Sequence, residues 1–145
     1  VAPDGTVSLG SLSLEQLQQL KQGAQQEVEY LTQSVAQLHS AVDRLQSSRT
    51  CAKEYAAVTT ETPVLVPLTS SIFVHGKVQA DTDLLVDIGT GYFAERKPEV
   101  ASEYFARRVT TVKEQIEKAN QALSQKRQHL EAITAVYQRK VALAA

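Results

Sequence analysis

The chain has 145 residues, a net charge of −1 at pH 7, 43% hydrophobic residues and 6% aromatic residues. This length fits one domain-sized unit. Residues 98–145 carry eight basic and five acidic residues, which are interspersed. The chain therefore lacks the clustered basic stripe that is typical of a protein that binds nucleic acid.

Other features of the sequence narrow the class of protein further. No apolar run reaches the length of about 18 residues that would indicate a membrane-spanning helix. The first residues contain neither a basic segment nor an apolar segment, so we expect no secretory signal. Cys51 is the single cysteine, which excludes an intrachain disulfide and fits a reducing compartment.

A first long helix is predicted over residues 13–60. Ser13 followed by Gln16 forms a capping-box pattern at its start, and no Gly or Pro occurs between Ala24 and Thr62. Apolar residues repeat along it at the a and d positions of a heptad. They are Leu14, Leu17, Ala24, Val28, Leu31, Val35, Leu38, Val42, Leu45 and Ala52.

A second helix is predicted over residues 98–144. Pro98 suits the first helical position, and Glu99 places negative charge in the first turn. A second heptad stripe runs along this helix, through Phe105, Val109, Val112, Ile116, Ala119, Leu123, Leu130, Ile133 and Tyr137. Two stripes of similar length in one chain predict an antiparallel coiled-coil hairpin.

Charged residues interrupt both stripes towards the two ends of the chain. Lys21, Lys126 and Lys140 occupy a or d positions there. Because a charged seam residue weakens coiled-coil packing, we expect a looser seam at the end of the hairpin remote from the connector.

The connector, residues 63–96, changes from a heptad period to a period of two. Strands are predicted at 64–68, 72–78, 83–88 and 92–96, with turns between the first two and between the last two. Two hairpins of this size have little core of their own and leave strand edges open. The sequence therefore predicts a single mainly α domain over residues 1–145, whose small β part pairs with the same type of sheet in other subunits.

Two patterns in the connector could indicate ligand binding. Gly89-Thr90-Gly91 could form a phosphate loop, but the residues after it predict a strand and not the required helix. Asp81, Asp83 and Asp87 could bind a divalent metal, but their spacing lacks the Gly and Glu of an EF-hand loop. A hairpin turn and turn capping are the favoured interpretations.

The sequence also gives little support for a catalytic site. Ser70 or Ser71 with His75 and Asp87 supplies the residue types of a hydrolase triad, but no Gly-x-Ser-x-Gly elbow is present. His39 and His129 lie on separate predicted helices without further metal ligands nearby in the sequence. We expect no enzyme activity, no cofactor and no catalytic or metal-binding residue.

The connector resembles the signature of the α-class prefoldin family. The resemblance rests on Leu65 to Lys77 and on Leu85 to Phe93, and it extends over about residues 11–140. It implies an ATP-independent co-chaperone that is a hexamer of two α-class and four β-class subunits. In that family the β-hairpins form a central barrel, and coiled-coil tips capture unfolded actin and tubulin for the cytosolic chaperonin. A cytoplasmic location, with the nucleus as a second one, follows from the same resemblance.

The resemblance assigns two sets of residues. Barrel assembly falls on Leu65, Val66, Leu68, Ile72, Val74, Leu85, Val86, Ile88, Tyr92 and Phe93. Client binding falls on Leu12, Leu14, Leu17, Leu20, Val136, Tyr137, Val141 and Leu143.

Some of these client residues have a second interpretation. Leu17 and Tyr137 lie on the heptad stripes, so seam packing explains them equally well, whereas Leu20 and Val136 lie off the stripes and are expected to be exposed. The alternative for the whole chain is a structural subunit of a prefoldin-like complex that binds no client directly.

Overall fold

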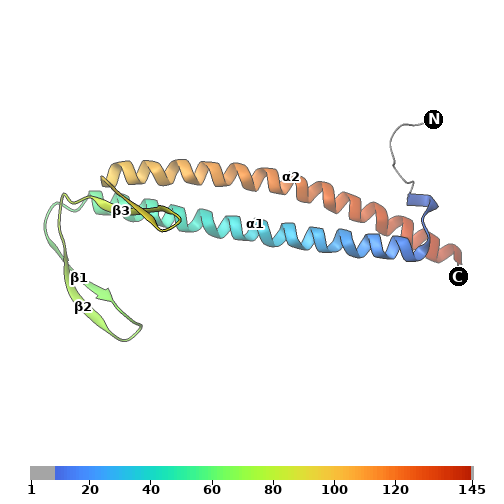
Figure 1. Cartoon of the computed structure of the whole chain (residues 1–145), viewed down its shortest axis with the longest axis horizontal. Coiled ribbons are helices and arrows are strands. Elements are labelled where there is room, and N and C mark those ends of the chain that lie inside the picture. The colour runs from blue at the N-terminus through green and yellow to red at the C-terminus, as the bar shows by residue number, and fades with distance from the viewer. Residues whose placement is uncertain (1–8, 145) are drawn as a thin grey trace. The chain divides into compact units, whose positions relative to one another are not determined.

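The computed structural model describes residues 9–144, which form two long helices and two β-hairpins (Figure 1). The predicted fold class is confirmed. The elements in chain order are η1 (Leu9–Ser11), α1 (Leu14–Ala56), β1 (Thr62–Pro67), β2 (Phe73–Val78), β3 (Leu84–Gly89), β4 (Tyr92–Arg96) and α2 (Pro98–Ala144).

The chain divides into two compact units. We call residues 9–39 and 113–144 the terminal unit and residues 40–112 the connector unit. The terminal unit holds the start of α1 and the end of α2, which lie side by side as the blue and red helices of Figure 1. The connector unit holds the other parts of both helices and all four strands.

The heptad stripes account for most of the buried apolar residues. In the terminal unit the buried members are Leu17, Ala24, Ile116, Leu123 and Ile133. In the connector unit Val42, Ala52 and Val109 are buried stripe residues. The seam therefore follows the a and d pattern, as expected for two helices that pack through one narrow apolar stripe each.

Helix α1 begins at the predicted capping box. The backbone N–H of Ser13 donates to Gln16 Oε1 over 2.9 Å, and the N–H of Gln16 donates to Ser13 Oγ over 3.2 Å. These reciprocal bonds satisfy two donors that the helix itself leaves unpaired.

Helix α1 ends at Ala56 and not at the expected residue 60. The N–H groups of Ala57 and Val58 donate to carbonyls three residues back, over 3.2 and 3.0 Å, which tightens the last turn. Val58, Thr59 and Thr60 are β-branched and Pro63 disfavours helix in the residue before it, so the sequence after Ala56 supports extended backbone.

The two hairpins are separate antiparallel sheets of two strands each. In the first, Val66 pairs with Val74 and Pro67 with Phe73. In the second, Val86 pairs with Ala94, and the register shifts by a bulge between Asp87 and Gly89. Each strand has one unpaired edge, because no third strand joins either sheet in the described part of the chain.

The segment Gly89-Thr90-Gly91 is the turn of the second hairpin. All three residues have positive φ, of 106°, 53° and 80°. Asp87 Oδ1 accepts the N–H of Gly89 over 2.8 Å, which stabilises the turn. Since β4 follows directly, the segment lacks the helix N-terminus that a phosphate loop requires.

The second hairpin packs on the helices of its own chain. Val86 is 5% exposed and packs in one cluster with Ala52 of α1 and Ala101 of α2. The two alanines are small enough to let strand and helices approach closely. Leu84, Tyr104 and Phe105 extend the cluster.

Tyr55 ties the end of α1 to the segment between β2 and β3. Its hydroxyl donates to the carbonyl of Gln79 over 2.8 Å and also contacts the hydroxyl of Thr82. The Thr82 hydroxyl lies 3.3 Å from the same Gln79 carbonyl, and Asp81 beside it has a φ of 60°. This connection thus has a defined conformation, which the sequence did not reveal.

Candidate functional site

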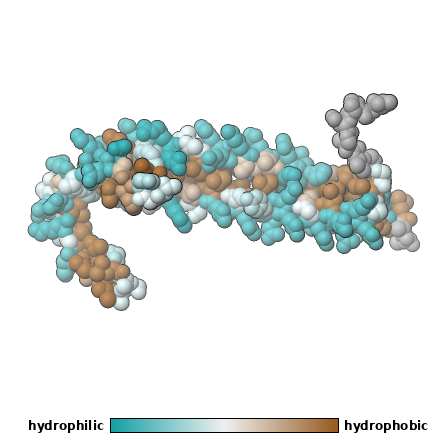
Figure 2. Space-filling view, viewed as in Figure 1, coloured by the Kyte–Doolittle hydropathy of each residue, from teal (hydrophilic) through white to brown (hydrophobic). Residues whose placement is uncertain are grey.

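The hairpins expose large apolar side chains, whose contact with water is unfavourable in a free chain. We call this set the hairpin surface, and Figure 2 shows the part of it on the β1–β2 hairpin as a brown covering. Nine of the ten residues predicted for assembly belong to it, and their exposed fractions lie between 45% and 70%. The hairpin surface comprises Leu65, Val66, Leu68, Ile72, Phe73, Val74, Leu85, Ile88, Tyr92 and Phe93.

The register explains why both faces of the first hairpin are apolar. Directly paired residues share a face, so Val66 and Val74 lie on one face and Pro67 and Phe73 on the other. Val66 is 45% exposed and Val74 47% exposed. A two-stranded sheet that is apolar on both faces and open at both edges is suited to burial between other chains.

Phe73 and Val86 differ from the sequence-based assignment. Phe73 is 50% exposed and belongs to the hairpin surface, although it was not among the predicted assembly residues. The resemblance assigned the neighbouring Ile72 and Val74 to the barrel and left Phe73 out. Val86 was predicted to face another subunit, but it is buried against Ala52 and Ala101 of its own chain.

The terminal unit is closed by an apolar cluster, which we call the end cluster. Leu17 and Ile133 are fully buried in it and are the largest fully buried side chains of the described residues. The expectation of a looser seam here is therefore wrong. The end cluster comprises Leu17, Ala24 and Ile133, with Leu9, Leu12, Leu130, Val136 and Tyr137 packed against them.

Each of the three seam lysines has a partner in this unit. Lys126 Nζ lies 2.6 Å from Glu27 Oε2. Lys21 Nζ lies 5.5 Å from the centre of the Tyr137 ring, within the range of a cation–π interaction. Lys140 Nζ donates to the carbonyl oxygen of Leu12. Because each ammonium group reaches a partner, the seam closes despite its charges.

The client residues predicted from the resemblance differ in exposure. Leu14 is 36% exposed, Leu20 39%, Val141 42% and Leu143 82%. Leu17 is fully buried, so in this structure it packs the seam. Leu12, Val136 and Tyr137 are half-buried against the end cluster. The expectation of an exposed side chain is confirmed for Leu20 and wrong for Val136.

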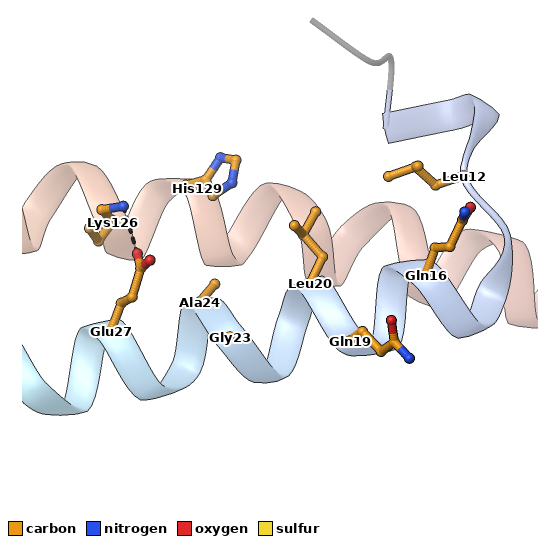
Figure 3. Close-up of a pocket in the computed structure, with 9 residues that line it drawn as sticks. All are labelled: Leu12, Gln16, Gln19, Leu20, Gly23, Ala24, Glu27, Lys126 and His129. Carbon is orange, nitrogen blue, oxygen red and sulfur yellow. Dashed lines mark ion pairs between the residues drawn. The ribbon is translucent and has the colours of Figure 1, made fainter.

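A groove of about 510 Å³ lies beside the end cluster (Figure 3). Leu12, Leu20 and Ala24 give it apolar walls, and the Lys126–Glu27 pair closes one end of it in the view of Figure 3. The remaining lining residues are Gln16, Gln19, Gly23 and His129. The groove is shallow and mixed in character, which fits a peptide surface better than a pocket for a small molecule.

The pKa of Glu27 is lowered from its ordinary value. The main cause is the hydrogen bond from Lys126, and the positive charges of Lys126 and His129 act in the same direction. Since a carboxyl with a depressed pKa in the folded state stabilises the fold above its unfolded pKa, this contribution is lost as pH falls through the folded value.

We expect Lys126→Gln to return the pKa of Glu27 upward to the ordinary range of a glutamate. A carboxyl-detected NMR titration of the folded protein measures this. Arg127→Gln is the matched control, because it removes the same charge from the next residue and leaves the pair intact. An unchanged Glu27 titration in the Lys126 variant would show that the pair does not persist in solution.

No group of three or more His, Cys, Asp or Glu side chains that could hold a metal occurs among residues 9–144. His39 and His129 are both exposed. Over the same residues, neither helix is apolar enough along its length to cross a bilayer.

Comparison with known proteins identifies the family. The family model described as "Prefoldin subunit" matches residues 24–143. The chain is 39% identical over 137 residues to a probable prefoldin subunit 5 of Dictyostelium discoideum, covering 94% of this chain and 85% of that protein. It is 33% identical over 136 residues to prefoldin subunit 5 of Homo sapiens, covering 94% and 88%.

A solved structure shows the same fold. The chain superimposes on a subunit of the filamentous PFD from Methanocaldococcus jannaschii, determined by cryo-EM, with a TM-score of 0.69. The match covers 81% of this chain and 98% of that chain, at 21% identity. With the two exposed β-hairpins, the family model and the two relatives in agreement, the chain belongs to the prefoldin family and has the role of a prefoldin co-chaperone subunit.

Proposed function

We propose that this chain holds unfolded proteins at its terminal unit, without ATP, as one subunit of a larger complex. The main support for this proposal is a set of aliphatic side chains that stay exposed beside a closed seam. Leu14, Leu20, Val141 and Leu143 all belong to the terminal unit, and each is at least 36% exposed. Weak apolar contacts of this kind gain affinity when several subunits present them together.

Assembly through the hairpin surface supplies those further subunits. The partners that the family resemblance implies are α- and β-class prefoldin subunits in a hexamer of two α and four β chains. Unfolded actin and tubulin are the clients, and the cytosolic chaperonin receives them. The chain acts in the cytoplasm, with the nucleus as a second location. It uses no cofactor, catalyses no reaction, and binds neither nucleic acid nor membrane.

The combined substitution Leu20→Ser, Val141→Ser and Leu143→Ser tests client binding. In the assembled complex we expect at least about twofold more complex to be needed for the same suppression of actin aggregation, because one set of multivalent contacts is lost. Light scattering of diluted, unfolded actin measures this. Tyr30→Ser is the control, since Tyr30 is 71% exposed on the same helix and belongs to neither the end cluster nor the groove.

The second candidate function is a structural subunit without client contact. It is favoured by the size of the hairpin surface, which exposes ten large apolar side chains. Unchanged suppression of aggregation by the triple variant, in complexes of unchanged mass, would support this candidate over client binding.

A further inference from the structure

The residues before α1 form a short segment that lies on the end of α2. We call residues 9–12 the strap; its first three residues are the 3-10 turn η1. Leu9 and Leu12 pack, half-buried, against the end cluster of Leu17, Ala24 and Ile133. In Figure 1 the strap begins at the blue turn beside the red end of α2, and Figure 3 shows Leu12 over that helix.

Apolar packing and a hydrogen bond attach the strap to the terminal unit. Leu9 and Leu12 supply its apolar contacts, and the Leu12 carbonyl accepts a hydrogen bond from Lys140 Nζ. No residue of η1 is fully buried. Helix α1 does not need the strap for its own start, because Ser13 and Gln16 cap it. Departure of the strap would therefore leave the start of α1 capped.

The surface beneath the strap continues into exposed apolar surface. Leu12 lines the groove together with Leu20. Val136 and Tyr137 of α2 pack against the same cluster as the strap leucines. Departure of Leu9 and Leu12 would therefore expose a further apolar surface beside Leu20. That surface already accommodates two leucine side chains.

We propose that the strap occupies a client-binding site in cis, and that a client segment replaces it there. The strap indicates which client segments would fit. They carry two leucine-like side chains three positions apart, and the backbone carbonyl of the second accepts a hydrogen bond from Lys140. This inference rests on the proposed holding function and defines which client segments the terminal unit selects.

A photoreactive copy of the strap tests the proposal in the assembled complex. The probe is a peptide with the sequence of residues 7–13, Val-Ser-Leu-Gly-Ser-Leu-Ser, with a diazirine analogue of leucine at its second leucine. Labelling is read by mass spectrometry on the tryptic peptide of residues 128–139, which contains Ile133, Val136 and Tyr137. This peptide belongs to the present chain, so the other subunits do not contribute to the signal.

The variant Leu9→Ser with Leu12→Ser should increase labelling at a fixed probe concentration by about threefold or more, because a site covered in most molecules gains apparent affinity when its cover is removed. Lys140→Gln should also weaken the strap, but it removes a bond to the probe as well, so a smaller increase is expected. Tyr30→Ser should leave labelling unchanged. An excess of the same peptide without the diazirine should compete the labelling away, whereas the peptide with serine at both leucine positions should not compete.

Two results would overturn the strap proposal. Equal labelling of the wild type and the double-serine variant would show that the strap does not compete for the site. Lower labelling in the double-serine variant, at unchanged melting temperature, would show that Leu9 and Leu12 bind the probe themselves.

If the strap variant gains labelling but the Leu20, Val141 and Leu143 variant still suppresses actin aggregation fully, the covered site exists and the proposed holding function fails. If the strap variant gains no labelling and the Leu20, Val141 and Leu143 variant suppresses aggregation less well, the strap proposal fails and the holding function stands.

Discussion

Replacement of Leu17 by alanine is expected to lower the free energy of unfolding of the terminal unit by about 2–5 kcal/mol. Leu17 is fully buried and contacts Ile133 across the seam in one cluster. Truncation removes apolar contacts and leaves a cavity that two continuous helices cannot easily collapse to fill. Urea unfolding of the assembled complex, followed by amide hydrogen exchange in residues 14–30, measures the local loss.

Leu20→Ala is the matched control for this measurement. Leu20 lies one turn further along α1, and its side chain is 39% exposed. The same truncation should therefore cost only about 0.5 kcal/mol. A similar loss for both variants would contradict the closed seam, since it would mean that Leu17 is hydrated as often as Leu20.

Under the proposed holding function, a closed end cluster limits which residues of the terminal unit a client can contact. If the seam opened, the binding surface would be Leu17 and Ile133, and every binding event would cost the full packing of the unit. With these two residues buried, the surface available without unfolding is the exposed aliphatic set and the apolar surface beneath the strap. Binding to a terminal unit that stays folded costs less conformational entropy than binding to one whose helices have separated.

The parts of the fold that local pattern determines were predictable. The two heptad stripes, the Ser13–Gln16 capping box and the four alternating strands all appear in the structure. Each of them depends on residues within a few positions of one another. The residues of the hairpin surface were assigned by the family resemblance, and pattern added only that two hairpins have too little core to bury their apolar residues.

The parts that long-range contacts determine were not predictable. Lys140 interrupts its stripe, but its partner, Leu12, lies 128 positions away in the sequence. Alternation treats Val86 like Leu85 and Ile88, and only the approach of Ala52 and Ala101 separates it from them. Tyr55 carries no local signal for its bond to Gln79, which is 24 positions away.

Replacement of Val66 and Val74 by aspartate is expected to remove this chain from its complex. The two residues are cross-strand neighbours on one face of the first hairpin, and each is about half exposed. In the free chain the aspartates remain hydrated, and their repulsion at directly paired positions weakens the first hairpin by only about 0.2–1 kcal/mol. In an assembly that buries this face, two unpaired carboxylates would each be desolvated, at a cost of several kcal/mol.

A loss of even 2 kcal/mol weakens association by about 30-fold. Native mass spectrometry of the reconstituted complex should therefore show this chain as free subunit at concentrations where the wild type is fully incorporated. Lys77→Asp is the control: it places the same charge on β2 and breaks only the exposed pair of Lys77 with Glu61, whose atoms lie 3.1 Å apart. Such an exposed pair contributes about 0–1 kcal/mol, so the control chain should still assemble.

Full incorporation of the Val66 and Val74 variant would show that this face stays open to water in the complex. The assembly contact would then have to lie on the opposite face, which carries Leu65 and Phe73, or on the second hairpin, which exposes Leu85 and Phe93. Aspartate at Phe73 and at Phe93, each alone, separates these two cases. The first hairpin exposes apolar side chains on both faces, whereas the second already buries Val86 against its own helices. The first hairpin is therefore where charge should disrupt assembly most strongly.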